Sequence, residues 1–128
     1  MKLLSDTHSF IWSFSNTKKL SPTAAQAFKN PANQIFLSVA SVWEMQIKIA
    51  LGKMVFNDTL ESILSEQQTI NGIQIFPVQL AHALYLENLP PHHKDPFDRL
   101  LISQAIVENM TLVSADADFA KYQVKLLW

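Results

Sequence analysis

The sequence has no cysteine and only two glycines, Gly52 and Gly72, and each shortage removes classes of function. Without cysteine there is no disulfide, no thiolate nucleophile and no cysteine-ligated zinc or iron–sulfur site. Two isolated glycines cannot form the phosphate-binding loop or the dinucleotide-binding fingerprint, which each need several glycines close together. Any bound metal must therefore be held by oxygen or imidazole, and the sequence argues against a nucleotide-cofactor enzyme.

Long apolar runs and excess positive charge are also missing. No apolar stretch approaches the roughly 20 residues that cross a bilayer, and the first residues lack the apolar stretch and cleavage site of a signal peptide. We therefore expect a cytoplasmic protein without a membrane partner. The formal net charge of −1 gives no broad basic field, so a nucleic acid would have to be held by local contacts. The 128 residues, 48% of them hydrophobic, predict one domain over 1–128.

Short aliphatic or β-branched runs alternate with longer segments of helical periodicity. This alternation predicts an α/β domain with a parallel sheet. The expected strands are Lys2 to Ser5, Gln34 to Ser38, Ile73 to Pro77, Thr111 to Ser114 and Val124 to Leu127.

The segments between these runs carry start and stop signals for helices. Helices are expected after the Ser21-Pro22 cap, from about Ala40 to Leu51 before Gly52, from a capping box at Asp58 and Glu61 toward Ile70, from Ala81 to Leu89 before Pro90, and through Leu100 to Val107. Asp95 directly before Pro96 is expected to cap the last of these helices. That cap places Asp98 in the first turn.

Four acidic residues, Asp6, Glu44, Asp98 and Asp116, follow expected strands or lie in the first turns of expected helices. In an open parallel sheet these places converge on a crevice outside the carboxyl ends of the strands. Carboxylates gathered there repel one another unless a cation joins them. With Mg²⁺ or Mn²⁺ they form the oxygen-rich site that phosphodiester hydrolysis requires. The four acids are the candidate metal ligands and catalytic residues.

Each acid also has a purely structural interpretation. Asp6 can cap the helix that follows it, and Glu44 fits a capping box with Ser41. Asp98 in a first turn can simply complement the helix dipole, worth about 0.3–1 kcal/mol. The chemical interpretation is favoured because four carboxylates at one edge of a sheet would strongly repel one another, and capping alone does not require them to be gathered there.

The fourth acid has a neighbour of the same kind. Asp116 and Asp118 both follow the strand that ends near Ser114, and one of them is expected to be only a first-turn acid of a short helix. Asp116 is favoured for the site because it lies nearer the strand end. Asp118 remains the alternative.

Four blocks of sequence around these acids carry a family resemblance. They are Leu4 to His8, Leu37 to Glu44 with Ile47-Lys48, Leu89 to Ile102, and Leu112 to Phe119. The third block is the most specific, because capping alone does not call for the run His-His-x-Asp-Pro-Phe-Asp-Arg. Together they resemble the PIN-domain family, and specifically VapC-type ribonuclease toxins of bacterial toxin–antitoxin pairs.

The resemblance implies a single PIN-like domain, with a central parallel sheet of about five strands in the order 3-2-1-4-5 flanked by helices. It also implies a Mg²⁺- or Mn²⁺-dependent endoribonuclease that hydrolyses RNA and inhibits translation or growth until a cognate antitoxin covers the site. A homodimer is expected. Matching the motifs residue by residue places the metal-binding acids on Asp6, Glu44, Asp98 and Asp116.

Further residues are expected around the acids. Hydroxyl groups that suit the orientation of carboxylates or coordinated water belong to Thr7, Ser38 and Ser114. Arg99, the only arginine, is expected to grip a phosphate or pair with an acid of the site, with a surface salt bridge as the alternative. Lys48 is expected to contact the RNA backbone. His92 and His93 are expected to be polar features of their loop, with weaker claims to RNA contact, and not zinc ligands.

Aromatic residues are expected in the core or at interfaces. Trp43 is the exception that could stack on a base, although packing is the favoured role. Phe10, Ile11 and Phe14 on the first helix are expected to be exposed and to receive an amphipathic segment of the antitoxin.

Two other functions fit parts of the sequence. A phosphotransfer hydrolase or a receiver-like domain also places an aspartate after its first strand. The former needs a second aspartate where His8 stands, and the latter needs an acidic pair that Leu4-Ser5-Asp6 lacks. A non-catalytic PIN-like binding module keeps the fold without the chemistry. Metal-dependent RNA cleavage that is lost on Asp6→Ala separates the enzyme from such a module.

Overall fold

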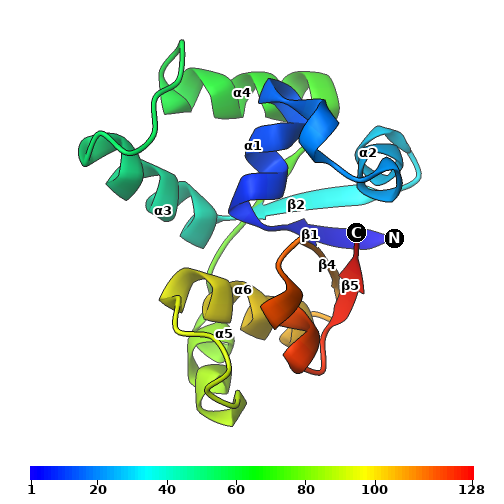
Figure 1. Cartoon of the computed structure of the whole chain (residues 1–128), viewed down its shortest axis with the longest axis vertical. Coiled ribbons are helices and arrows are strands. Elements are labelled where there is room, and N and C mark those ends of the chain that lie inside the picture. The colour runs from blue at the N-terminus through cyan, green and yellow to red at the C-terminus, as the bar shows by residue number, and fades with distance from the viewer.

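The computed structural model describes residues 1–128 and places five strands in one sheet (Figure 1). The strands are β1 (Lys2–Ser5), β2 (Gln34–Ser38), β3 (Gln74–Phe76), β4 (Thr111–Val113) and β5 (Lys125–Leu127). Their order is β3-β2-β1-β4-β5, and every neighbouring pair is parallel. The α/β class and the order 3-2-1-4-5 are therefore confirmed. The last three strands are slightly shorter than predicted.

The central strand β1 is buried on both faces. Successive side chains of a strand point to opposite faces. Leu3 therefore packs with Phe10 and Met45 in one hydrophobic cluster, and Leu4 packs with Leu101 and others in a second. This double burial explains why the strands are near-continuous apolar runs.

Six α-helices flank the sheet. They are α1 (Thr7–Ser15), α2 (Pro22–Lys29), α3 (Val39–Ala50), α4 (Leu60–Asn71), α5 (Leu80–Tyr85) and α6 (Pro96–Val107). Short 3₁₀ turns are η1 (Thr17–Lys19), η2 (Leu86–Asn88) and η3 (Ala117–Lys121). Residues of α1 to α4 join the cluster on one face, whereas α6 and η3 contribute to the cluster on the other (Figure 1). None of the helices is long and apolar enough to cross a membrane.

The caps of α2 and α6 are those that the sequence predicts. The Ser21 hydroxyl accepts a hydrogen bond from the Ala24 backbone N–H at 3.0 Å. Asp95 Oδ1 accepts from the backbone N–H groups of Phe97 and Asp98, at 2.8 and 3.3 Å. Asp98 is thereby the third residue of α6, with its own side chain free of capping.

The predicted start of α3 is wrong by one residue, and its capping box is wrong. The Ser38 hydroxyl accepts from the Ala40 backbone N–H at 3.0 Å, so the helix begins at Val39. Ser41 then lies inside the helix and cannot cap it, which removes the capping interpretation of Glu44. The structure also uses Ser38 as a helix cap, and the predicted contact between Ser38 and the carboxylates is not seen.

The starts and ends of two other helices also differ from prediction. Thr59, not Asp58, caps α4 by accepting from the Ser62 backbone N–H at 3.2 Å. Asp58 accepts instead from the Thr59 N–H at 2.7 Å and lies outside the helix. The predicted helix from Ala81 to Leu89 is split into α5 and η2, because the chain tightens into 3₁₀ geometry before Pro90.

An exposed apolar surface lies on α3, whereas the three apolar residues of α1 that were predicted to be exposed are buried or half-buried. Phe10 is fully buried in the core, and its neighbours Ile11 and Phe14 are only partly exposed. The large apolar side chains that are at least 36% exposed on α3 and its C-cap are Val39, Trp43, Ile47 and Leu51, here called the α3 stripe. They recur every fourth residue and share one side of the helix.

Candidate functional site

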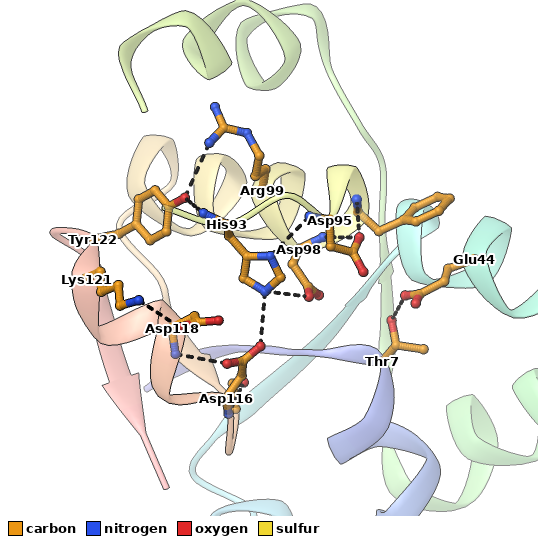
Figure 2. Close-up of polar contacts among 12 residues, drawn as sticks. Thr7, Glu44, His93, Asp95, Asp98, Arg99, Asp116, Asp118, Lys121 and Tyr122 are labelled. Carbon is orange, nitrogen blue, oxygen red and sulfur yellow. Dashed lines mark hydrogen bonds and ion pairs between the residues drawn. The ribbon is translucent and has the colours of Figure 1, made fainter. Parts of the chain in front are cut away.

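The four predicted acids come from four separate elements and meet at the carboxyl ends of the strands. Asp6 directly follows β1, and Asp116 follows β4, which is paired with β1 through Ser5 and Val113. Glu44 lies on α3, which follows β2, and Asp98 lies in the first turn of α6. Figure 2 shows Glu44, Asp98 and Asp116 around one centre. The parallel sheet therefore gathers the acids as the sequence suggested.

Asp6 is both a helix cap and a member of this group. Its Oδ1 accepts from the Ser9 backbone N–H at 2.8 Å, so the structural interpretation of Asp6 as a helix cap is confirmed. Burial raises the pKa of Asp6 above the ordinary aspartate range, and hydrogen bonds with Ser114 and Ser9 partly offset that effect. A single buried carboxylate thus fixes the start of α1 and brings negative charge to the site.

Asp98 carries the clearest electrostatic signature. Burial, followed by the neighbouring Asp95 and then by Glu44 and Asp6, raises the pKa of Asp98 to about 7, against an opposing effect of His93. Removal from water disfavours the charged form of a carboxyl group, and neighbouring negative charges disfavour it further. Perturbation of this kind, in a group that faces other acids, is typical of functional sites.

Glu44 is held from two sides. Its Oε1 accepts from the Thr7 hydroxyl at 2.6 Å, and its Oε2 pairs with Lys48 Nζ at 2.8 Å. The Thr7 hydroxyl is also hydrogen bonded to the Ser41 hydroxyl at 2.9 Å. Thr7 therefore lies where its predicted orienting role requires. Lys48 neutralises Glu44 and remains partly exposed, so its predicted contact with the RNA backbone stays a prediction.

Asp116 contacts His93 at the centre, whereas Asp118 contacts Lys121 (Figure 2). Asp116 Oδ2 lies 3.1 Å from His93 Nε2, and its Oδ1 accepts from the Asp118 backbone N–H at 2.9 Å. Asp118 has 48% of its side chain exposed and pairs with Lys121 at 3.0 Å, which lowers the pKa of Asp118. The Ser114 hydroxyl accepts from the Asp116 backbone N–H at 3.0 Å. The geometry favours Asp116 as the fourth acid.

His93 is the functional candidate that the sequence analysis underrated. Its Nε2 lies 3.1 Å from Asp98 Oδ2 and 3.1 Å from Asp116 Oδ2, so it stands between two of the four acids (Figure 2). His92, in contrast, is exposed and packs edge-on against the Tyr122 ring, with 5.4 Å between centroids. The available signal was the position of His93 inside the most specific motif, two residues before the cap of α6.

Arg99 has a structural task. The predicted pairing with an acid of the site is not present, and the predicted phosphate contact stays a prediction. The Arg99 guanidinium donates to the backbone carbonyl groups of Pro90, Leu86 and Leu89 and to the Tyr122 hydroxyl, at 2.9 to 3.4 Å. No acid pairs with it, which also excludes the surface salt bridge. Arg99 ties the turn before the His93 loop to α6 and η3, and this fixes the loop that carries His93.

The donor set suits a hard divalent cation. Ligating atoms of His93, Asp98 and Asp116 lie within 4.8 Å of one another, with Asp6 and Glu44 close enough to influence Asp98. Carboxylate oxygens are the ligands that Mg²⁺ and Mn²⁺ prefer. An open groove of about 360 Å³ adjoins the site between α3 and the start of α6, and it is lined by Glu44, Ile47, Lys48, Lys94, Asp95, Pro96 and Phe97.

Trp43 stands at this side of the molecule with its ring largely in solvent. Trp43 is 61% exposed, and its ring packs edge-on against the Phe97 ring with 5.2 Å between centroids. Trp43 is therefore not a core residue, and its predicted role at an interface stays a prediction. The residue that precedes Glu44 offers an exposed aromatic surface next to the site.

Comparisons with known proteins agree with this architecture. The family model of the PIN domain matches residues 3–125. By structure the chain is similar to VapBC2 from Rickettsia felis bound to a promoter DNA fragment, with a TM-score of 0.70 and 18% identity over 98% of this chain and 97% of that chain. It is also similar to DNA-bound VapBC from Salmonella typhimurium, with a TM-score of 0.67 and 12% identity over 98% and 96% of the two chains.

A third similar structure is FitAcB from Neisseria gonorrhoeae, with a TM-score of 0.64 and 15% identity over 97% of this chain and 95% of that chain. By sequence, no curated protein matches the chain. At these identities the structural likeness establishes the fold, whereas the chemistry has to be argued from the residues of the site.

Proposed function

Because the chain belongs to the PIN-domain family, we propose that it is a metal-dependent endoribonuclease and the VapC-type toxin of a toxin–antitoxin pair. The observation that carries the proposal is the meeting of Asp6, Glu44, Asp98 and Asp116 at the strand ends, with the pKa of Asp98 raised to about 7. Residues 1–128 would form one catalytic domain that cleaves RNA in the cytoplasm and inhibits translation or growth.

The residues present fit a divalent cation. Burial is the main cause that raises the pKa values of Asp98 and Asp6, with neighbouring acids adding to it at Asp98, so a bound cation would favour the ionised forms of both groups. Asp6, Glu44, Asp98 and Asp116 would hold Mg²⁺ or Mn²⁺. A cation bound there would supply Lewis-acid activation of the attacking water and stabilise negative charge on the scissile phosphate.

The protein's own contribution is orientation. Glu44 is fixed by Thr7 and Lys48, and Asp6 is fixed by the Ser9 N–H, so neither buried carboxylate has to reorganise when a substrate arrives. Asp98 and Asp116 have more exposed side chains than Glu44, with 20% and 39% exposed against 5%. The phosphate would therefore approach from the Asp98 and Asp116 side.

Cleavage of RNA by the purified chain tests the proposal. Cleavage should appear with Mg²⁺ or Mn²⁺, fall to background with excess chelator and return when the cation is restored, because the carboxylates alone cannot neutralise the charge that develops on phosphate. Products would be followed on total RNA, transfer RNA and messenger RNA. Cleavage that persists with chelator would contradict the metal dependence, and no cleavage of any RNA would favour the non-catalytic module.

The α3 stripe is the surface that we propose for the antitoxin. The similar solved structures include a toxin–antitoxin complex from Klebsiella pneumoniae. An amphipathic segment places apolar side chains at helical spacing into an apolar surface of this kind. Trp43 directly precedes Glu44, so a segment bound on the stripe would lie beside the candidate site.

Leu80 and Leu84 expose a second apolar surface on α5, which we propose for a homodimer.

Replacing Trp43 with Ala should weaken antitoxin binding by about 10- to 100-fold, since exposed tryptophans that become buried are frequent hot spots of about 2 kcal/mol or more. Isothermal titration with the cognate antitoxin measures this change. Ile70→Ala is the matched control, because Ile70 is 68% exposed on α4 and lies outside the stripe. Equal affinities for the Trp43 variant and the wild type would contradict the assignment of this surface.

A further inference from the structure

The ring of His93 is oriented by the backbone, and this determines which of its nitrogens carries hydrogen. Its Nδ1 lies 3.1 Å from the Asp95 backbone nitrogen and accepts the hydrogen of that N–H. A backbone N–H is only a donor, so Nδ1 must present its lone pair, and the ring hydrogen resides on Nε2. Nε2 is the nitrogen that lies 3.1 Å from both Asp98 Oδ2 and Asp116 Oδ2.

The position of the ring is also well determined. The His93 backbone N–H donates to the Tyr122 hydroxyl at 2.8 Å, and the ring packs against Phe119 with 5.6 Å between centroids. Only 13% of the side chain is exposed. Because Tyr122 is in turn held by Arg99 at 3.3 Å, the loop, α6 and η3 together aim Nε2 at the two carboxylates.

The same contacts argue against His93 as a metal ligand, although its Nε2 is near enough to be counted with Asp98 and Asp116. A histidine that binds a metal through one nitrogen normally donates its other N–H to an acceptor. Ligation through Nε2 would move the ring hydrogen to Nδ1, where it would point at the Asp95 N–H. Two donors would then face each other at the site of the present hydrogen bond.

We propose that His93 is a positioning residue of the cation site, whose Nε2–H holds the carboxylates of Asp98 and Asp116 in place without its nitrogen joining the metal. The inference rests on the proposed function for the identity of the site. A donor between two carboxylates offsets their repulsion and restricts their rotation, so both acids are arranged before a cation arrives. Loss of such an outer partner typically costs about 10- to 100-fold in metal affinity.

This role accounts for the run His-x-Asp-Pro-Phe-Asp at residues 93–98. The Asp95 side chain caps α6, and its backbone N–H sets the hydrogen of the His93 ring. The helix that Asp95 starts then carries Asp98 back to the same ring. One short loop thus supplies a ligand and the group that orients it.

Titration of Mn²⁺ into the full chain, followed by electron paramagnetic resonance of free Mn²⁺, tests the affinity. His93→Leu should raise the dissociation constant about 10- to 100-fold. His93→Gln, whose amide N–H can reach the same carboxylates, should retain much more of the affinity. His92→Leu is the matched control and should bind as the wild type does. Equal losses for the Gln and Leu variants, or no loss for either, would overturn the donor role.

Spectra of the wild type decide between donor and ligand, even if His93→Leu fails to fold. Nitrogen-15 NMR of the metal-free protein, with the signal assigned through His93→Gln, should show the hydrogen on Nε2. Pulsed electron paramagnetic resonance of the Mn²⁺-loaded protein should show no coupling from a directly bound imidazole nitrogen. A hydrogen on Nδ1, or a bound nitrogen that disappears in His93→Gln, would overturn the proposal.

These readouts do not depend on RNA cleavage. If Mn²⁺ binds with the expected dependence on His93 and no RNA is cleaved, the proposed function fails and the positioning role stands. If RNA is cleaved and the His93 variants bind Mn²⁺ as the wild type does, only the positioning role fails. A wild type that binds no Mn²⁺ overturns both.

Discussion

Replacing Asp98 with Asn should reduce metal-dependent RNA cleavage by about a thousandfold or more. The amide has the shape of the carboxylate without its charge, so the site loses one of the groups that hold the cation. Metal-ion catalysis supplies several kcal/mol of charge stabilisation, and each 1.4 kcal/mol corresponds to about tenfold in rate. Initial rates on a labelled RNA, at saturating Mg²⁺ or Mn²⁺, measure the change.

The same substitution should leave the fold intact. The pKa of Asp98 is raised to about 7, so the folded chain already resists the charge that Asn removes. Metal-free Asp98→Asn should therefore be at least as stable as the wild type near neutral pH, as measured by urea unfolding. An inactive variant that is also strongly destabilised would mean that Asp98 serves structure and not chemistry.

Asp116 and Asp118 provide an internal control for this prediction. Asp116→Asn should show a loss similar to that of Asp98→Asn, because Asp116 faces the centre beside His93. Asp118→Asn should cleave as the wild type does, because Asp118 pairs with Lys121 at the surface. The reverse outcome, with Asp118 essential and Asp116 dispensable, would contradict the assignment of the fourth acid.

Cation binding should depend strongly on pH, with the Mn²⁺ dissociation constant rising about tenfold for each pH unit below 7. A cation has to displace the proton of Asp98, whose pKa is raised to about 7 by burial and by neighbouring carboxylates. Between about pH 7 and pH 5 the affinity should fall about 100-fold. Titrations at several pH values measure this dependence, and Asp98→Asn should show a much flatter one.

As pH rises, the stability of the metal-free protein should fall, whereas the affinity for Mn²⁺ should rise. Asp98 has an ordinary pKa of 3.8, so between about pH 4 and pH 7 the folded chain holds a proton that the unfolded chain has released. Stability therefore falls as pH rises through this window, by about 1–2 kcal/mol for a partly solvated group, and is fully restored only below the ordinary pKa. Urea unfolding at each pH, with and without Mn²⁺, measures both trends. Affinity and stability that are both independent of pH would contradict the raised pKa.

Much of the fold could be predicted from the sequence, because the patterns that indicate strands and helix starts are local. The near-continuous apolar runs around Leu3 and Ile35 predict buried parallel strands, and Ser21-Pro22 and Asp95-Pro96 predict helix starts. These features depend on a few adjacent residues, so they survive without knowledge of the rest of the chain. Ser41 was wrongly predicted to cap α3. The Ser38 hydroxyl, three residues earlier, already accepts from a backbone N–H of the first turn, so the helix begins before Ser41.

Residues whose role depends on distant partners were harder to predict. Phe10 was expected at the surface and is buried against Leu3, because the direction of α1 over the sheet decides which side of the helix is covered. Arg99 was expected to grip a phosphate or pair with an acid; no acid pairs with it, and it binds three carbonyl groups of the preceding turn. A long cationic side chain can reach several partners, and sequence spacing does not choose between them.

The sequence by itself determined the α/β class, the places of the strands and the acids that belong at their carboxyl ends. It could do so because the periodicity and capping of each element are local, and because parallel strands bring their ends to one edge. Only the tertiary structure decided that Asp116 and not Asp118 contacts His93 at the centre, that Lys48 is used to neutralise Glu44, and that His93 stands between two acids. These choices depend on side-chain directions and on hydrogen bonds between segments far apart in the chain, which no local pattern encodes.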